Sequence, residues 1–174
     1  YGTEYYCNRH TEGEKFILLT NNIKQTSFPL TYINANKYYK VVTTGKELEE
    51  TDAITFQYRG NIFKPYAPCH IIATRNANND LIISWTRRTR IGGDWRDNVD
   101  ILLGEDFERY NIEILDKNNR DRLKRIIEVK DIQTATYTAE QQQIDFGEVQ
   151  GSVKFKIYQL SAIVGAGYER EMVV

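Results

Sequence analysis

The feature that most constrains the fold is a series of short β-prone runs in the second half of the chain. Runs rich in Val, Ile, Thr, Tyr and Phe are interrupted at frequent intervals by Asn, Gly and Asp, a pattern typical of strands joined by turns. About seven strands in about 110 residues are typical of a two-sheet β-sandwich. The predicted strands are His70–Arg75, Leu81–Thr86, Arg109–Leu115, Arg122–Val129, Gln133–Thr138, Val153–Ser161 and Tyr168–Val174.

The first third of the chain predicts a smaller β domain. Its expected strands are Lys15–Thr20, Tyr38–Thr43 and Ala53–Tyr58, and the last of these alternates polar and apolar residues with the period of a half-buried strand. Glu47–Asp52 has room for at most one helical turn. Lys64–Pro68 carries two prolines, which stiffen the backbone and remove ladder donors. We therefore expect a domain boundary there, with domains at 1–63 and 64–174.

Two segments of the second half are compatible with helix. Leu123, Ile126 and Ile127 fit a helical stripe, but their position after an Asn-Asn turn and between two predicted strands favours a strand. Ala139–Asp145 is rich in glutamine and predicts a helical turn that crosses between sheets and stops at Gly147.

Composition excludes several classes of function. A net charge of −1 gives no basic footprint for nucleic acid or for anionic membranes. No apolar run approaches the roughly 20 residues of a membrane-spanning helix. Because Met172 is the only methionine and the chain begins at Tyr1, we expect an excised piece of a longer polypeptide.

Two cysteines and two histidines raise the question of a zinc site. They occur as Cys7 with His10 and as Cys69 with His70. Adjacent residues of a strand point to opposite faces, so Cys69 and His70 are poorly placed to share a metal ion. We therefore expect no metal and no cofactor.

The second half resembles a fibronectin type III sandwich. Pro65 and Pro68 match the proline-rich entry of that fold, and Trp85 matches its second-strand tryptophan. Tyr110–Ile114 resembles its third strand, and Lys156–Ser161 with Gly165–Gly167 resembles its sixth strand and the following loop. The resemblance implies an all-β architecture: a small N-terminal β domain followed by this immunoglobulin-like β-sandwich. It also implies a structural core that includes Trp85, Tyr110 and Tyr158.

A second resemblance covers most of the chain. Trp85–Trp95 (WTRRTRIGGDW) is similar to a signature of the large baseplate hub proteins of tailed phages and gene transfer agents. Further motifs keep that family's order, although Leu102 stands where the family often has proline. These motifs are Gly2–Tyr5, His10–Glu14, Lys64–Pro68, Leu102–Glu105, Glu108–Tyr110, Asp145–Gly147 and Tyr158–Ser161.

This resemblance implies the C-terminal part of a host-specificity, or tip attachment, protein. It implies a virion tail tip or a prophage-derived particle whose protein is made in the bacterial cytoplasm. The implied partners are other tail or baseplate subunits and a host cell-surface component, without nucleic acid or membrane insertion. A homo-oligomer is compatible with the full-length protein.

The residues favour a scaffold over an enzyme. The sequence contains no nucleophile elbow, phosphate loop or metalloprotease helix, and its carboxylate pairs lie in a mixed-charge loop. A non-enzymatic structural and interaction module is the leading interpretation. The alternative is a carbohydrate-binding accessory domain of a cell-wall-active enzyme, suggested by the paired tyrosines Tyr5-Tyr6 and Tyr38-Tyr39.

The long polar stretch Arg87–Glu108 indicates which end of the sandwich would contact a binding partner. Its arginines either form internal forks with carboxylates or face a partner, with Trp95 as an aromatic anchor. In a fibronectin-type sandwich this loop and the loop at Ile163–Tyr168 lie at one pole, where glycine lets backbones approach closely. The candidate residues of this pole are Arg87, Arg88, Arg90, Asp94, Trp95, Arg96, Glu105, Gly165, Gly167 and Tyr168.

Overall fold

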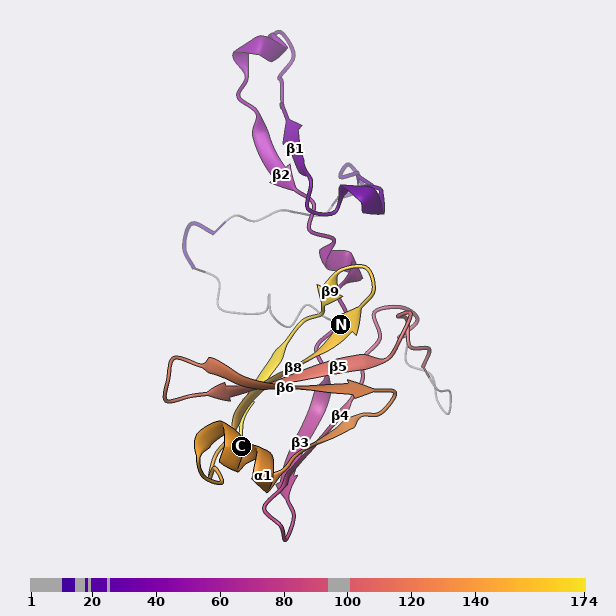
Figure 1. Ribbon diagram of the computed structural model, residues 1–174. Helices are drawn as coiled ribbons and strands as arrows, with labels where there is room; N and C mark the ends of the chain where they lie inside the picture. The colour runs from indigo at the N-terminus through magenta and orange to yellow at the C-terminus, as the bar shows by residue number, and fades with distance from the viewer. Residues whose placement is uncertain (1–10, 15–17, 19, 25, 94–100) are drawn as a thin grey trace. The chain divides into compact units, whose positions relative to one another are not determined.

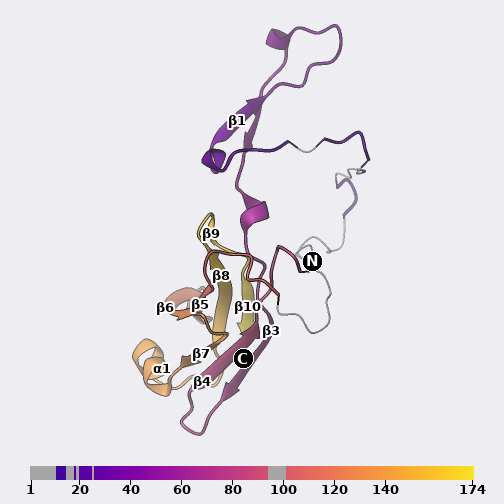
Figure 2. The ribbon, with the colours of Figure 1, turned by 90° about the vertical axis from the view of Figure 1, so that its right-hand side faces the viewer.

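The computed structural model describes residues 11–14, 18, 20–24, 26–93 and 101–174 (Figures 1 and 2). The described residues divide into two compact units, one ending at Ile62 and the other beginning at Phe63. Most of the predicted strand Lys15–Thr20 lies outside the described residues.

A β-hairpin dominates the described part of the first unit. Strands β1 (Asn36–Tyr39) and β2 (Ile54–Gln57) pair antiparallel, with Tyr38 opposite Thr55. Strand β2 lies within the run that predicted it, whereas β1 begins two residues before the predicted run Tyr38–Thr43 and shares only Tyr38 and Tyr39 with it. The expected helical turn between them is the 3-10 turn Leu48–Glu50, and further 3-10 turns span Leu30–Tyr32 and Asn61–Phe63.

The apolar face of this hairpin stays largely exposed. Ile54 and Phe56 point to one face, as the period of two predicts, yet they are 60% and 48% exposed. Phe28 gives partial cover by stacking on Phe56 and Tyr58, with ring centroids 6.2 and 5.0 Å away. Within the described part of the chain, the hairpin therefore has an amphipathic pattern without a buried core. A two-stranded hairpin of this kind is marginally stable in water.

The second unit is a sandwich of two antiparallel sheets. One sheet has the order β3 (Cys69–Arg75), β4 (Leu81–Thr86), β7 (Thr134–Tyr137). The other has the order β10 (Arg170–Val173), β8 (Lys154–Ser161), β5 (Arg109–Asp116), β6 (Arg122–Lys130). The two-residue strand β9 (Gly165–Ala166) folds back on β8. This arrangement confirms the predicted fold class, an all-β chain with a fibronectin type III-like sandwich.

The core lies between the two sheets and is formed by alternate residues of their strands. Trp85 and Tyr110 are 4% and 0% exposed, and their rings meet edge to face with centroids 5.0 Å apart. Such aromatic pairs contribute about 0.5–1.5 kcal/mol beyond the area that they bury.

The prediction that Tyr158 belongs to the core is wrong. Strand β8 alternates half-buried and buried residues, and Phe155 and Ile157 occupy inward positions. The period of two therefore turns Tyr158 outward and Gln159 inward, where Gln159 is 1% exposed. The Tyr158 hydroxyl donates to Glu113 Oε1 at 2.7 Å on the outer face of the sheet.

The ambiguous segment around Ile126 is a strand. It pairs with β5 from Arg122 to Lys130, with one register shift between Ile114 and Leu115. As an edge strand β6 has neighbours on one side only, and Ile126 is 45% exposed. This exposure explains why its apolar pattern did not identify a single buried face.

The predicted helical turn is the short helix α1 (Ala139–Phe146), which connects β7 to β8. Thr138 and Gln141 form a reciprocal capping box at its start, and Gly147 ends it with a φ of 81°. The helix lies at the opposite end of the sandwich from β9 (Figures 1 and 2).

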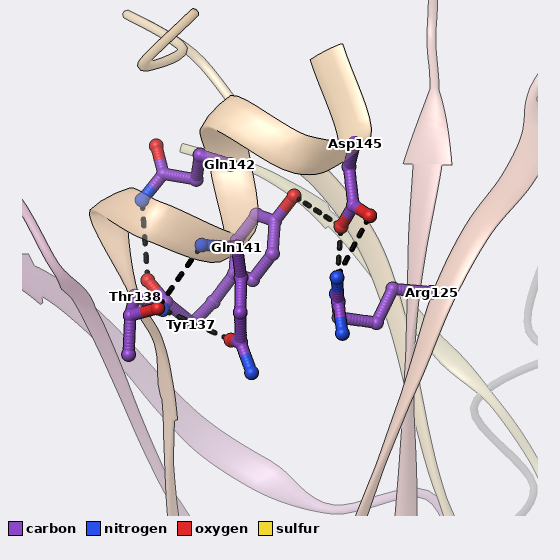
Figure 3. Close-up of polar contacts among 6 residues, drawn as sticks. All are labelled: Arg125, Tyr137, Thr138, Gln141, Gln142 and Asp145. Atoms are coloured by element: carbon purple, nitrogen blue, oxygen red, sulfur yellow. Dashed lines mark hydrogen bonds and ion pairs between the residues drawn. The ribbon is translucent and has the colours of Figure 1, made fainter. Parts of the chain in front are cut away.

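Polar contacts hold α1 on the sandwich (Figure 3). Asp145 accepts two hydrogen bonds from the Arg125 guanidinium, at 2.7 and 2.9 Å, and one from the Tyr137 hydroxyl at 2.8 Å. The fully buried Gln142 donates to the carbonyl oxygens of Asn79 and Tyr137. The helix is thus fixed by side chains from strands of both sheets.

Candidate interaction surface

The loops that carry the described residues of the predicted pole lie at the end of the sandwich opposite α1 (Figure 1). Three segments build this loop end: the entry segment 63–68, the loop after β4 with the segment before β5, and the loop around β9. Asp94, Trp95 and Arg96 lie outside the described residues, so the anchor role predicted for Trp95 stays a prediction.

Glu108 is the central acceptor of the loop end. Its carboxylate accepts hydrogen bonds from the Tyr110 hydroxyl at 2.9 Å, from Gln133 Nε2 at 3.2 Å and from Arg87 Nη1 at 3.4 Å. Arg87 also donates to the Ile101 carbonyl oxygen. Because Tyr110 is a core residue, this network ties the surface loops directly to the core.

A second ion pair fixes the two arms of the loop to each other. Arg90 Nε lies 2.6 Å from Glu105 Oε1, and the two side chains are only 14% and 4% exposed. The arms meet closely at Gly104, whose φ is 73°; a Cβ there would lie 2.7 Å from Thr89 Oγ1. The positive φ and this short contact together favour glycine at position 104.

The entry segment packs against the loops through rings and backbone. The Arg88 guanidinium lies 5.0 Å from the ring centroid of Tyr66, a cation–π contact. The backbone N–H of Tyr168 donates to the Pro65 carbonyl at 2.9 Å, and that of Gly167 donates to the Gln159 carbonyl at 2.9 Å. The proline-rich entry segment and the glycine-rich loop around β9 are thus held together by backbone hydrogen bonding.

We expect Gly167→Ala to destabilise the sandwich. A Cβ at this position would lie 2.8 Å from the carbonyl oxygens of both Gln159 and Pro65, and backbone atoms cannot move aside cheaply. The expected loss is about 1–3 kcal/mol in the free energy of unfolding, as for other overpacked sites. Urea denaturation checks this, with Gly151→Ala as the control because a Cβ at Gly151 meets nothing within 4 Å. Equal midpoints for the two variants would contradict the close approach.

Two buried tyrosines make stability sensitive to alkaline pH. Burial, followed by the hydrogen bond to Glu108, raises the pKa of Tyr110 above its ordinary value of 10.0. Burial and Asp145 raise the pKa of Tyr137 in the same way. A raised pKa contributes stability that is complete below the unfolded value and is lost as the pH rises toward the folded one.

We therefore expect the urea midpoint to fall as the pH rises above about 10, where the unfolded tyrosines ionise. Tyr137→Phe removes one of these groups and should make the decline less steep than in the unchanged protein. Midpoints measured at closely spaced pH values from neutral to alkaline test this. A decline of the same slope in both proteins would show that Tyr137 does not contribute.

The described arginines of the loop end make internal contacts of two kinds. Arg87 and Arg90 each contact a carboxylate of their own loop, whereas Arg88 contacts an aromatic ring. Sequence reasoning missed Gln133 and Tyr66 as partners, because neither lies in the loop itself. It also missed the central role of Glu108, which lies one residue before β5 and two residues before Tyr110.

The cysteines and histidines that raised the question of a zinc site are divided between described and undescribed residues. Cys7 and His10 lie outside the described part. The Cys69 thiol lies 3.7 Å from the Thr86 carbonyl oxygen, and His70 is exposed with a φ of 48°, where β3 bulges. Among the described residues, no three His, Cys, Asp or Glu side chains are placed to hold a metal ion. No described helix has the length and apolar character to span a bilayer.

Comparisons with known proteins found structural similarity and no sequence match. No model of a known protein family matches the sequence, and no curated protein matches it. Domains d3–d4 of the rat CD45 extracellular region align with a TM-score of 0.44 at 11% identity, covering 97% of this chain and 78% of that one. The FN5 domain of Drosophila Lar aligns with a TM-score of 0.40 at 16% identity, covering 63% of this chain and 94% of that one. The fold assignment made above stands on strand order and register.

Proposed function

We propose that this chain is a non-enzymatic structural and interaction module of a phage-like tail tip. Its role is to help build the baseplate and to present a surface toward the host envelope. The resemblance of its ordered motifs to baseplate hub proteins supports the tail-tip assignment. Its partners are then other tail subunits and a component of the host cell surface.

The observation that carries an assembly role is the exposed apolar face of the β1–β2 hairpin. Tyr39, Ile54 and Phe56 share this face, and each is at least 39% exposed. An amphipathic hairpin gains stability when its apolar face is covered, because burial contributes about 25 cal/mol per Å² of apolar surface. An apolar hairpin face that is exposed in the isolated chain is expected of a subunit whose neighbours cover that face in the assembly.

The polar groups with shifted pKa values fit a structural role. Catalytic sites concentrate perturbed titratable groups in clefts. Here the hydroxyls of Tyr110 and Tyr137 are shifted by burial and by hydrogen bonds to Glu108 and Asp145, which fix a loop and a helix. These hydroxyls stabilise the fold through their hydrogen bonds, and we assign them no catalytic role.

Localisation in particles tests this function. We would induce phage-like particles from the source bacterium and label them with antibodies against the sandwich, using antibodies against a tail-tube protein as the control. Label confined to the tail tip is the expected result. Particles that carry tube label and no sandwich label would overturn the proposal. Retention of the recombinant chain on purified cell-wall glycan, without incorporation into particles, would instead favour the carbohydrate-binding alternative.

A further inference from the structure

A groove opens along one side of the sandwich, between the edge strands β3 and β10. These strands end their respective sheets, so each has a backbone edge that pairs with no described strand. The groove has a volume of about 470 Å³. Its lining combines an apolar surface with three nitrogen-bearing side chains and consists of Ala67, Pro68, Cys69, His70, Ile71, Arg88, Arg170 and Met172.

The lining of the β3–β10 groove has basic side chains and no carboxylate. Arg88 approaches it from the loop end, and Arg170 lies on the same face of β10 as Met172, which packs against the core. The Arg170 side chain has no hydrogen-bond or ion-pair partner in the described part of the chain. The groove therefore presents positive charge beside apolar surface, which suits an anionic ligand with an apolar flank.

The nearby carboxylates are occupied elsewhere. Glu171 Oε1 lies 2.9 Å from Lys154 Nζ, and Glu169 Oε1 lies 2.9 Å from Lys156 Nζ. Both lysines belong to β8, on the side of β10 away from its free edge. Neither acidic neighbour thus neutralises Arg170 by a direct ion pair.

The free edge of β10 also offers backbone groups. Val174 and Val153 exchange two backbone hydrogen bonds, at 2.8 and 3.0 Å. Hydrogen-bonded and non-hydrogen-bonded pairs alternate along antiparallel strands, so Met172 and Arg170 bond to β8 while Glu171 and Val173 point their N–H and C=O groups outward. Up to two residues of β10 can therefore pair with an added strand.

We propose that the β3–β10 groove binds an extended acidic peptide segment, which adds to β10 as a further strand and sets a carboxylate against Arg170. Backbone pairing supplies affinity and the Arg170 contact supplies specificity, as in other cases of strand addition. The segment belongs to a neighbouring subunit, and this identification of its source rests on the proposed function; the binding itself does not. An inward charge can also serve to discourage edge pairing, so the experiment must separate these roles.

Fluorescence anisotropy with the full chain tests the binding. The probe is a fluorescein-labelled peptide, Val-Thr-Asp-Val-Thr-Val, and its counterpart has Lys in place of Asp. We expect saturable binding of the acidic probe and at least about tenfold weaker binding of the lysine counterpart, a difference of about 1.4 kcal/mol. No binding of the acidic probe, or equal binding of the two probes, would overturn the proposal.

Two variants locate the site. Arg170→Gln should weaken acidic-probe binding about tenfold, whereas Arg122→Gln should leave it unchanged because the exposed Arg122 lies on β6, at the opposite edge of the same sheet. Val173→Pro removes an outward N–H that β8 does not use, so it should abolish probe binding while the sandwich stays folded by circular dichroism. A probe N-methylated at alternate residues should also fail to bind, which keeps the test valid if Val173→Pro does not fold.

The remaining outcomes distinguish the rival occupants. Full binding of the N-methylated probe would identify a simple anion site and overturn strand addition. Displacement of the acidic probe by millimolar inorganic phosphate or glucuronate alone would have the same meaning. Stronger acidic-probe binding by Arg170→Gln would identify the arginine as an edge-protecting charge. Particle labelling at the tail tip is independent of all these results, so the two proposals fail separately.

Discussion

Arg90→Ala is expected to cause the largest loss of stability of any single substitution at the loop end. Removal of the guanidinium leaves the Glu105 carboxylate, whose side chain is 4% exposed, without its 2.6 Å partner. Breaking a buried pair from one side costs about 3–5 kcal/mol, because the remaining charge stays desolvated. Urea denaturation followed by tryptophan fluorescence measures the loss.

Lys117→Ala is the matched control for this prediction. Lys117 lies in the exposed turn between β5 and β6, and its side chain makes no ion pair with any described residue. An exposed charge of this kind contributes about zero to 1 kcal/mol. Equal midpoints for Arg90→Ala and Lys117→Ala would show that the loop is not held by the ion pair. The arginines would then be better interpreted as contacts for a partner.

Asp145→Ala should release α1 from the sandwich. The substitution removes the acceptor for both the Arg125 guanidinium and the buried Tyr137 hydroxyl. Since Arg125 keeps 26% exposure and can be rehydrated, we expect a loss of about 2–4 kcal/mol, less than for a fully buried pair. Thermal unfolding measures this loss, with Glu148→Ala, an exposed carboxylate just after the helix, as the control.

A double-mutant cycle separates the two partners of Asp145. If the ion pair dominates, Arg125→Ala and Asp145→Ala combined should cost much less than the sum of the single losses. Additive losses would indicate that the Tyr137 hydroxyl is the more important donor. In either case, hydrogen exchange of α1 amides should be faster in Asp145→Ala than in the control.

The strands of the sandwich could be predicted because alternation and turn residues both mark them. The same alternation predicts the observed outward orientation of Tyr158, since Phe155 and Ile157 occupy the inward positions of β8. The error arose because the core assignment of Tyr158 rests on the resemblance of Lys156–Ser161 to the sixth strand of a fibronectin type III sandwich, and not on the alternation along the strand. Helix α1 was also recoverable, because Thr138, Gln141 and Gly147 are capping residues at the required spacing.

Long-range side-chain contacts at the loop end could not be predicted in this way. Glu108 and Gln133 are 25 positions apart, and they meet only because β5 and β7 both begin at the same end of the sandwich. The stacking of Arg88 on Tyr66 likewise depends on the path of the entry segment. Alternation determines which face a residue occupies, but the pairing of charged loop residues depends on topology and register.

The uncovered hairpin has a consequence for how unfolding of this protein should be measured. Its strands have few buried contacts, so their amides should exchange with solvent at a free-energy cost far below that of global unfolding. The central strands β5 and β8 carry fully buried residues and should exchange only when the whole sandwich opens. A melting temperature from circular dichroism would then describe the unfolding of the sandwich alone. A two-state fit to the entire chain would underestimate the cooperativity of that unfolding. Binding of a cover to the hairpin would appear as slowed exchange in β1 and β2, with little change in that melting temperature.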